Sequence, residues 1–203
     1  MITKGGDFME KKDLILDSML ELLAEKKGES CSVSEIAKKA GIAKGGMYYY
    51  FKSKEEVFDA LVERTYQNII DDCQNIASSS GENAIEKLKH LYIHYRSSII
   101  SSDLDAYLHK PQNAGIHQKS LAKILTSLSP IVAQIIEQGN EEKVFHCTYP
   151  LELSETIISV FCFLLDPGIF NWTPKQIERK LTVIVSMFEC ELGVTKGCID
   201  FFI

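Results

Sequence analysis

Apolar residues recur every three or four positions along most of the chain, which is the spacing of one face of an α-helix. The spacing predicts helices over residues 10–27, 32–40, 43–51, 54–78, 82–101, 121–138, 151–165 and 174–192, with a short one at 103–109. We interpret residues 1–9 as a loose arm and residues 111–117 and 139–150 as loops. The sequence therefore predicts an all-α fold.

Two short helices at 32–51 carry the clearest local signals. Ser32 followed by Glu35 has the spacing of a capping box, and so has Ser53 followed by Glu56 at the start of the next helix. Gly41 lies where the first short helix ends and is expected to adopt positive φ. These signals predict a helix-turn-helix followed directly by a long third helix.

The second short helix has an unusual outer face. At 100° per residue, Met47 and Phe51 lie close together and are expected to face the core. The remaining face carries two glycines and the tyrosines, which span about 200° and cannot all be buried: Gly45, Gly46, Tyr48, Tyr49 and Tyr50. Glycines destabilise a helix but let its backbone approach a partner closely.

Residues 36–54 contain five lysines and no acidic residue: Lys38, Lys39, Lys44, Lys52 and Lys54. A small basic helix-turn-helix with a bare outer face suits the major groove of DNA, where tyrosines and lysines reach phosphates. The three arginines lie at 64, 96 and 179, outside this region. Bidentate arginine–guanine contacts are therefore absent, which favours specificity based on DNA shape.

The same region resembles the DNA-binding domain of the TetR family of transcriptional regulators over about residues 10–62. The matching positions are Ile36-Ala37, Gly41-Ile42, Lys44-Gly45, Tyr48, Phe51 and Lys54. The resemblance implies an N-terminal three-helix DNA-binding domain, a C-terminal helical domain that binds an effector and dimerises, and usually repression.

Carried over by position, the resemblance makes Tyr48, Tyr49 and Tyr50 contact DNA, places Lys44 beside them and lets Lys54 touch a phosphate. With Ser32, Gly45 and Gly46, these residues form the expected DNA-binding set. The chain departs from the family at Ala43, where Ser is common, and at Gly46, where Ser or Thr is common. The expected domains are an arm at 1–9, a DNA-binding head at 10–53 and an effector-binding and dimerisation domain at 54–203.

Composition and charge fit this division. The chain has 203 residues and a net charge of −6, of which residues 1–60 contribute −1 and residues 61–203 contribute −5. The basic patch is thus local, and the acidic remainder would repel DNA and help to orient the protein. The longest nearly apolar stretch, 157–165, is too short to span a bilayer, and no signal peptide is visible. We expect a cytoplasmic protein without membrane contact.

The last two predicted helices are apolar on more than one side. One side would pack on the subunit core and the other on a second copy, giving a four-helix homodimer interface. The alternative is a hairpin buried entirely inside a monomer. The expected interface residues are Ile157, Phe161, Leu164, Leu181, Ile184 and Phe188.

An effector pocket is suggested by the resemblance alone. Aromatic residues in the C-terminal half are its candidate lining, although most aromatics at helical spacing simply fill a core: Tyr92, Tyr95, Tyr107, Phe145, Phe161, Phe170 and Trp172. An apolar or aromatic small molecule is mildly favoured, because no acidic residue stands out as a partner for a cation. A protein partner in place of a small ligand is the alternative.

The sequence gives little support for a metal site, a redox pair or an enzyme active site. His90 and His94 share a helix face, but no third ligand has matching spacing, so solvated histidines are favoured over a metal site. Six cysteines occur without a CxxC motif, which favours reduced, buried thiols over a redox pair. Nucleophile, zinc-protease and nucleotide-binding motifs are absent. We expect no enzyme activity, no cofactor and no metal, and a homodimeric repressor that leaves a palindromic operator when an effector binds.

Overall fold

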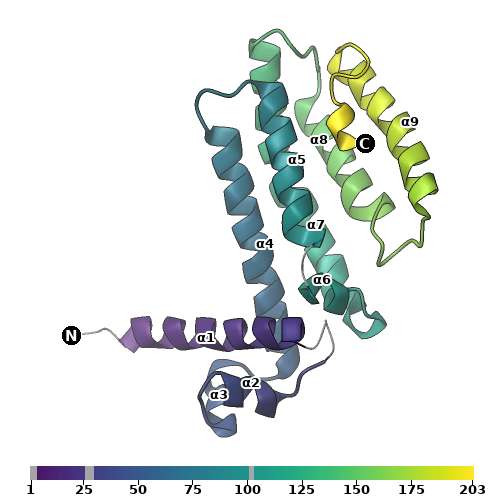
Figure 1. Cartoon of the computed structure of the whole chain (residues 1–203). Helices are drawn as coiled ribbons and strands as arrows, with labels where there is room; N and C mark the ends of the chain where they lie inside the picture. Colours follow the sequence, from purple (N-terminus) through teal and green to yellow (C-terminus); the bar gives the residue numbers. More distant parts are fainter. Residues whose placement is uncertain (1–3, 26–29, 101–102) are drawn as a thin grey trace. The chain divides into compact units, whose positions relative to one another are not determined.

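The structure, a computed structural model, describes residues 4–25, 30–100 and 103–203. Over these ranges the chain is helical and contains no strand, so the predicted all-α fold is confirmed (Figure 1). The α-helices are α1 Lys4–Glu25, α2 Val33–Lys39, α3 Lys44–Tyr50, α4 Lys54–Ser78, α5 Ala84–Ile100, α6 Asp103–Leu108, α7 Ala114–Glu141, α8 Pro150–Ser159 and α9 Pro174–Leu192. The short turns are η1 Pro111–Asn113 and η3 Asp200–Phe202, both 3-10, and η2 Val160–Leu164, which is π-helical.

The chain divides into two compact units. The first comprises residues 1–67 and 101–117, and the second comprises residues 68–100 and 118–203. Residues 54–67 of α4 and 103–117 therefore belong with the helix-turn-helix, whereas the sequence prediction assigned them to the C-terminal domain. Residues 103–117 join the first unit because α6 packs against α1, and the start of α4 joins it through Phe58, which packs on Tyr107 of α6.

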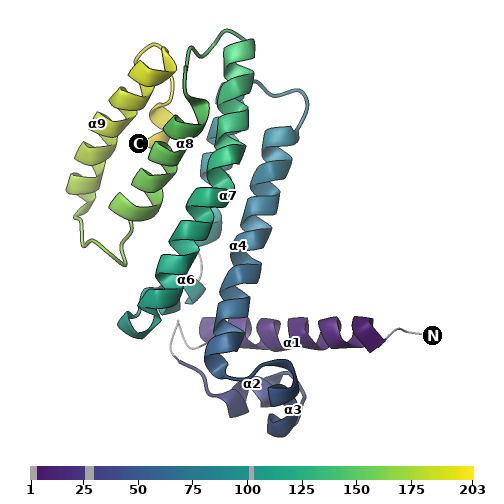
Figure 2. The same cartoon turned by 180° about the vertical axis from the view of Figure 1, so that it is seen from behind.

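The first unit is built around the apolar stripe of α1. Ile15, Met19 and Leu23 are fully buried. Both α2 and α3 pack on this helix, as Figure 2 shows. Phe58 of α4 meets Tyr107 of α6 edge to face, with ring centroids 4.7 Å apart. These contacts hold the two short helices on a shared core, which neither could form alone.

The second unit is a helical bundle in which α8 and α9 form an antiparallel hairpin (Figure 1). Its core lies along α7, where Leu128, Ile135 and Ile136 are fully buried. Lys87 is also buried, and its ammonium group donates to the carbonyl of Ala77, 2.7 Å away near the C-terminal end of α4. A cation is favourable there because the last carbonyls of a helix carry partial negative charge.

Several element boundaries differ from the sequence prediction. Residues 4–9 are helical rather than loose, because α1 begins at Lys4. Residues 111–117 form η1 and the first turn of α7 instead of a loop. The helix predicted at 151–165 changes to a π-helical turn at Val160. Residues 1–3, 26–27 and 101, included in the predicted arm and helices, lie outside the described residues.

A close contact follows α7. The backbone carbonyl of Gly139 accepts N–H groups from Val144 and Phe145, which closes the turn after the helix. The Phe145 ring lies directly over Gly139, and a Cβ atom built there would be 2.0 Å from the ring. The turn therefore requires glycine for space, whereas Gly41 and Gly193 are required for their positive φ angles of 66° and 68°.

One helical stretch, Pro111–Glu141, is long and apolar enough to cross a membrane by length and composition. The sequence prediction considered only 157–165 for that role. Half of the most apolar part of this stretch is buried inside the protein. That burial is typical of the core helix of a globular protein.

Candidate functional site

The helix-turn-helix begins at the predicted cap. The amide of Glu35 donates to Ser32 Oγ at 3.2 Å, and the amide of Ser32 donates to the Glu35 carboxylate at 2.8 Å. Both halves of the capping box are thus present. At the other end, Gly41 takes φ +66°, and the amide of Ile42 reaches back to the carbonyl of Ala37. Local signals in the sequence therefore fix both ends of α2.

The helix α3 is attached to the unit by very little of its surface. Met47 is its one buried residue among the seven, at 1% exposure. Tyr49 is 74% exposed and Tyr48 is 51% exposed. Beside them, Gly45 and Gly46 have no neighbouring atom within 4 Å of where a Cβ would lie. A bare backbone flanked by phenol groups can enter a groove and reach its walls.

Phe8 joins this surface, which the sequence analysis missed. Its ring centroid lies 5.6 Å from that of Tyr49 and 5.1 Å from that of Tyr50. The Lys12 ammonium group lies between Phe8 and Phe51, 5.3 Å and 5.2 Å from their ring centroids. Phe8 precedes the buried Ile15 by seven residues, so extending the apolar stripe of α1 backward would have found it.

The lysines of this region do not share one role. Lys39 pairs with Glu21 and Glu25 at 2.9 and 2.7 Å, and hydrogen bonds to Glu25 and then Glu21 raise its pKa. Lys54 donates to Ser30 Oγ at 3.0 Å. Lys44 is exposed beside Gly45 at the start of α3. The expected DNA-binding residues thus lie together in the first unit, but Lys39 is engaged in bracing α2 on α1.

The second unit contains an apolar cavity of about 30 Å³. Three of the aromatic residues expected in an effector pocket line it, namely Tyr92, Tyr95 and Phe161. The other lining residues come from α5, α7, α8, α9 and the turns η2 and η3: Leu88, Leu91, Leu128, Val132, Ile157, Ile158, Cys162, Leu192 and Phe202. No acidic or basic side chain is among these residues.

Polar groups at this cavity are hydrogen-bonded to one another. The Tyr92 hydroxyl donates to the carbonyl of Phe202 at 3.1 Å and accepts from Arg96 Nη1 at 2.9 Å. The Tyr95 hydroxyl lies 3.1 Å from Cys162 Sγ. Burial raises the pKa of the Cys162 thiol to about 11, so it is protonated at neutral pH. The cavity surface is therefore apolar, because the two phenol hydroxyls beside it already have partners in the protein.

The other expected pocket residues lie elsewhere. Tyr107 belongs to the first unit and packs on Phe58. Phe145 covers Gly139. Trp172 donates to the carbonyl of Leu164 at 2.9 Å and stacks on Phe170. All are aromatic residues at core or loop positions, and helical spacing could not separate them from the three at the cavity.

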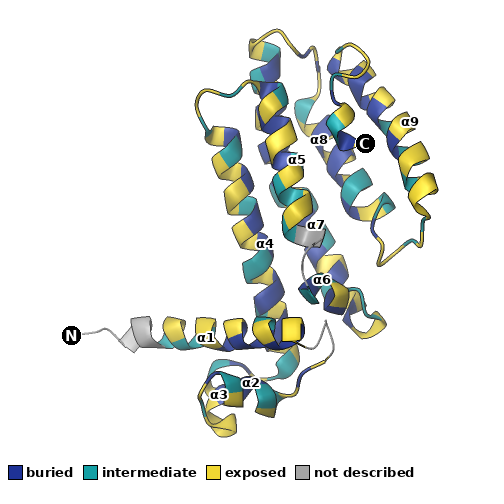
Figure 3. Cartoon of the chain, viewed as in Figure 1, coloured by how far each residue is buried: buried dark blue, intermediate teal, exposed yellow. Residues whose placement is uncertain are grey.

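The α8–α9 hairpin has two apolar sides, but the exposed side is not the one expected. Ile157, Leu181 and Phe188 are buried inside the subunit. Phe161, Leu164 and Ile184 are half-buried. The most exposed apolar residues of the hairpin are Phe163, Val183 and Met187, which we call the hairpin face. Figure 3 shows the exposed stripe that runs along α9.

The histidines pair with other groups. His90 Nδ1 lies 2.8 Å from a Glu82 oxygen, and His94 Nε2 lies 3.3 Å from an Asp72 oxygen. The two predicted as a possible metal pair thus meet different carboxylates.

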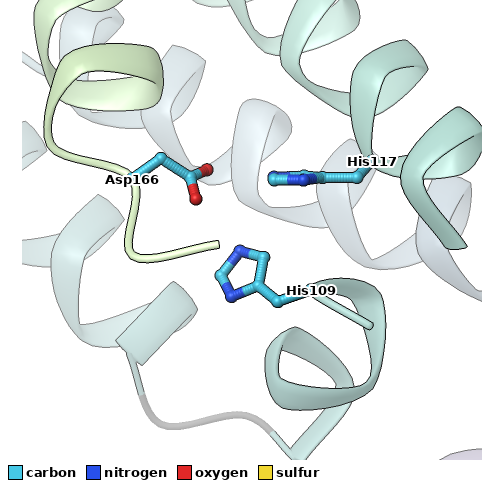
Figure 4. A group of neighbouring side chains, drawn as sticks. All are labelled: His109, His117 and Asp166. Carbon is cyan, nitrogen blue, oxygen red and sulfur yellow. The ribbon is translucent and has the colours of Figure 1, made fainter. Parts of the chain in front are cut away.

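In the first unit, the rings of His109 and His117 lie 4.7 Å apart (Figure 4). Asp166, drawn in the same view, belongs to the second unit, where it accepts the amide of Gly168 at 2.6 Å.

All six cysteines lie within the described residues, and none forms a disulfide. Cys31, Cys73, Cys147 and Cys162 are buried, as reduced thiols usually are. Burial raises the pKa of Cys73 to about 12. A buried thiol that stays protonated is a poor nucleophile.

Comparison with known proteins covers both units. Residues 15–61 match the family model for bacterial regulatory proteins of the tetR family, and residues 98–187 match the tetracyclin repressor-like C-terminal domain. The uncharacterized HTH-type transcriptional regulator YuxN of Bacillus subtilis is 33% identical over 94 residues, which are 46% of this chain and 32% of YuxN. The HTH-type transcriptional regulator AcrR of Shigella flexneri is 30% identical over 95 residues, covering 46% of this chain and 44% of AcrR. The match thus spans less than half the length of these curated relatives.

A solved structure agrees over most of the chain. The crystal structure of a TetR-family regulator from Mesorhizobium loti has a TM-score of 0.64 and covers 90% of this chain and 96% of its own. Its sequence identity is 16%, so it supports the fold alone. The helix-turn-helix geometry and the two family models together identify the chain: it belongs to the TetR family of bacterial transcriptional regulators.

Proposed function

We propose that this regulator is a homodimeric repressor that binds a palindromic operator through α3 and leaves it when a small apolar or aromatic molecule binds the second unit. The exposed face of α3 is the observation that carries the proposal. An aromatic side chain with 74% exposure, beside two glycines and a lysine, is stable in water but favours a partner that buries it.

The contacts expected at DNA follow from this face. Tyr48 and Tyr49 would reach phosphates or thymine methyl groups, while Gly45 and Gly46 let the helix backbone lie deep in the groove. Lys44 and Lys54 would pair with phosphates. Two copies would place their α3 helices in successive major grooves, about 34 Å apart or somewhat more, which is why a palindromic operator is expected.

The hairpin face supports the dimer. Phe163 on η2 and Val183 and Met187 on α9 are large apolar side chains that are 53, 60 and 63% exposed. A two-fold interface in which α8 and α9 of each copy form a four-helix arrangement would bury them. We expect Met187→Glu to convert the dimer to a monomer in analytical ultracentrifugation. Ile93→Glu, at an apolar residue that is 51% exposed on α5, is the matched control and should leave the dimer intact.

Repression would be released by differential affinity. A ligand that binds more tightly to the conformation with lower operator affinity shifts the population toward that conformation. The cavity lined by Tyr92, Tyr95 and Phe161 is the proposed ligand site.

Fluorescence anisotropy with DNA from upstream of the gene tests the proposal. Specific binding should exceed binding to a scrambled duplex and should weaken steeply with salt. About eight phosphate contacts would give a log–log slope near −7. Tyr49→Ala should lower specific affinity, whereas Tyr149→Ala, a tyrosine 62% exposed in the second unit, should not. Equal binding by wild type and Tyr49→Ala would refute the contact model.

A further inference from the structure

The segment 197–202 folds back onto the second unit, where it buries the side chains of Ile199 and Phe202 and bonds to one carboxylate. Gly197 takes φ +91° and its amide donates to Glu189 Oε1 at 2.6 Å, with the amide of Ile199 at 3.5 Å from the same oxygen. Glu189 is buried, at 4% exposure. Figure 1 shows the short turn η3 beside α8 and α9. We call this segment the strap; one carboxylate accepts two of its amides, and the buried side chains of Ile199 and Phe202 complete its attachment.

The end of the strap fills part of the effector cavity. Phe202 is 5% exposed, and its ring centroid lies 4.8 Å from that of Tyr92 and 5.3 Å from that of Phe161. Its carbonyl accepts the Tyr92 hydroxyl proton at 3.1 Å. The Phe202 ring therefore packs on both aromatic residues of the cavity wall, and its carbonyl accepts the hydrogen bond of the Tyr92 hydroxyl.

The remaining cavity is too small for a ring. It measures about 30 Å³, enough for a water molecule or two, whereas an engineered apolar cavity of about 150 Å³ binds benzene. Removal of a phenyl ring would supply space of that order. A three-residue 3-10 turn has few local hydrogen bonds to break, so it can leave more readily than any of the long helices around the cavity.

We propose that Phe202 occupies the place of a ligand's ring, and that a neutral single-ring aromatic molecule carrying one oxygen acceptor binds there when the strap leaves. The inference rests on the proposed function, because it concerns the same cavity. It adds to the proposed function the chemical class of the ligand and the idea that the Phe202 side chain competes with the ligand for the cavity.

The class follows from the groups that Phe202 leaves behind. Tyr92 and Phe161 would offer faces and edges to a second aromatic ring, in the arrangement they now make with Phe202. Arg96 Nη1 donates to the Tyr92 oxygen, so the hydroxyl proton is the group directed away from Arg96. A carbonyl or ether oxygen on the ligand would accept that proton. A charged ligand is disfavoured because the lining residues carry no opposite charge.

The test uses ethylbenzene and acetophenone, which have similar size and differ in the carbonyl oxygen. Binding to the full chain is measured by titration calorimetry. Wild type should bind acetophenone more tightly than ethylbenzene, and Tyr92→Phe should remove that preference. Phe202→Ala should bind ethylbenzene at least about tenfold more tightly than wild type, because no ring has to be displaced.

Two further variants make the test specific. Phe201→Ala is the matched control, since Phe201 contacts Phe202 but does not line the cavity, and it should bind like wild type. Glu189→Gln weakens the fastening of the strap and should give an affinity between wild type and Phe202→Ala. Circular dichroism checks folding, and Phe202→Leu, which keeps an apolar side chain but loses the ring, replaces Phe202→Ala if the latter unfolds.

Equal ethylbenzene affinities for wild type, the folded Phe202 variant and Phe201→Ala would overturn the inference. So would a rise in affinity for Phe201→Ala as large as that for the Phe202 variant. Operator anisotropy separates this result from the proposed function. Wild type that binds operator while no variant binds either ligand refutes the strap alone. A Phe202 variant that binds ethylbenzene in a protein without operator affinity refutes the repressor proposal alone.

Discussion

The helices α3 and α9 differ in how their N-termini are capped and in how many of their residues are buried. In α3 the cap position is Ala43, with no side-chain hydrogen bond, and the helix buries Met47 alone. In α9, the amide and the hydroxyl of Thr173 both donate to Gln176 Oε1, Gly193 closes the helix in the left-handed conformation, and five residues are buried. The contrast teaches that α3, which is proposed to contact a partner, leaves most of its surface exposed and depends on contacts with the rest of the unit for its stability. The packing helix α9 is stabilised by its own capping residues and by its buried face.

Deleting a buried ring should expose how strongly α9 depends on packing. Phe188 is 4% exposed, and Phe188→Ala should lower the free energy of unfolding of the second unit by about 3–5 kcal/mol. Urea denaturation followed by the fluorescence of Trp172, the one tryptophan in the chain, measures this. A loss below about 1 kcal/mol would show that the hairpin is not packed as described.

Deleting the single buried side chain of α3 should have a slightly smaller cost but a larger functional effect. Met47→Ala should cost about 2–5 kcal/mol, toward the lower end because an exposed short helix can collapse into the space. Operator binding should be lost while Trp172 still reports a folded second unit. Hydrogen exchange in α1–α3 should rise. Unchanged exchange there would contradict the idea that Met47 anchors α3.

Exchanging the cap chemistry of the two helices should move stability in opposite directions. Thr173→Ala should destabilise α9 by about 1 kcal/mol, and Ala43→Ser should stabilise α3 by a similar amount. Hydrogen exchange resolved by helix is the measurement for both. If Ala43→Ser leaves exchange in α3 unchanged, the stability of α3 is limited by its packing on the rest of the unit and not by capping.

The glycines of α3 should separate stability from binding. Gly45 has φ in the ordinary helical range and open space around it, so Gly45→Ala should stabilise the first unit by about 0.4–1 kcal/mol. The added methyl group lies on the face proposed to enter DNA, so operator affinity should fall. Anisotropy beside thermal unfolding tests the opposite signs. A variant that gains both stability and affinity would place Gly45 away from DNA.

Acid should weaken the start of α4 before that of α9. Hydrogen bonds from its own backbone amide and from Ser53 lower the pKa of Glu55, while the box of α9 uses the neutral Gln176. A lowered folded-state pKa gives stability that is present above about pH 4.5 and is lost as pH falls further. Because Glu55 is largely solvated, the effect should be a few tenths of a kcal/mol. Glu55→Gln should remove it in a pH series of unfolding measurements.

Sequence reasoning reached what is encoded locally. The capping pairs at Ser32 and Thr173 placed the starts of α2 and α9, because the hydrogen bonds involved join residues three apart. The same holds for Gly41, whose left-handed conformation follows from residue type. The family resemblance rested on this local region, and both family models bear it out.

What sequence reasoning missed depends on distant partners. Phe8 was assigned to a loose arm because nothing near it in sequence shows that Tyr49 and Tyr50 lie beside it. The buried and exposed apolar sides of α9 could not be told apart, since either side fits the core by spacing alone. Phe202 at the cavity was invisible for the same reason, because its partners lie 110 positions away at Tyr92 and about 40 away at Phe161.

The Phe145 ring above Gly139 limits which amino acids position 139 can accept during evolution. Residues at the proposed ligand site and on the proposed operator-facing surface have open space beside them, so their side chains can change in size without a clash inside the protein. Position 139 has no such freedom, because even a methyl group would lie 2.0 Å from a ring that is itself fully buried. In a library that randomises every codon, we expect this inconspicuous glycine to tolerate fewer replacements than Tyr49.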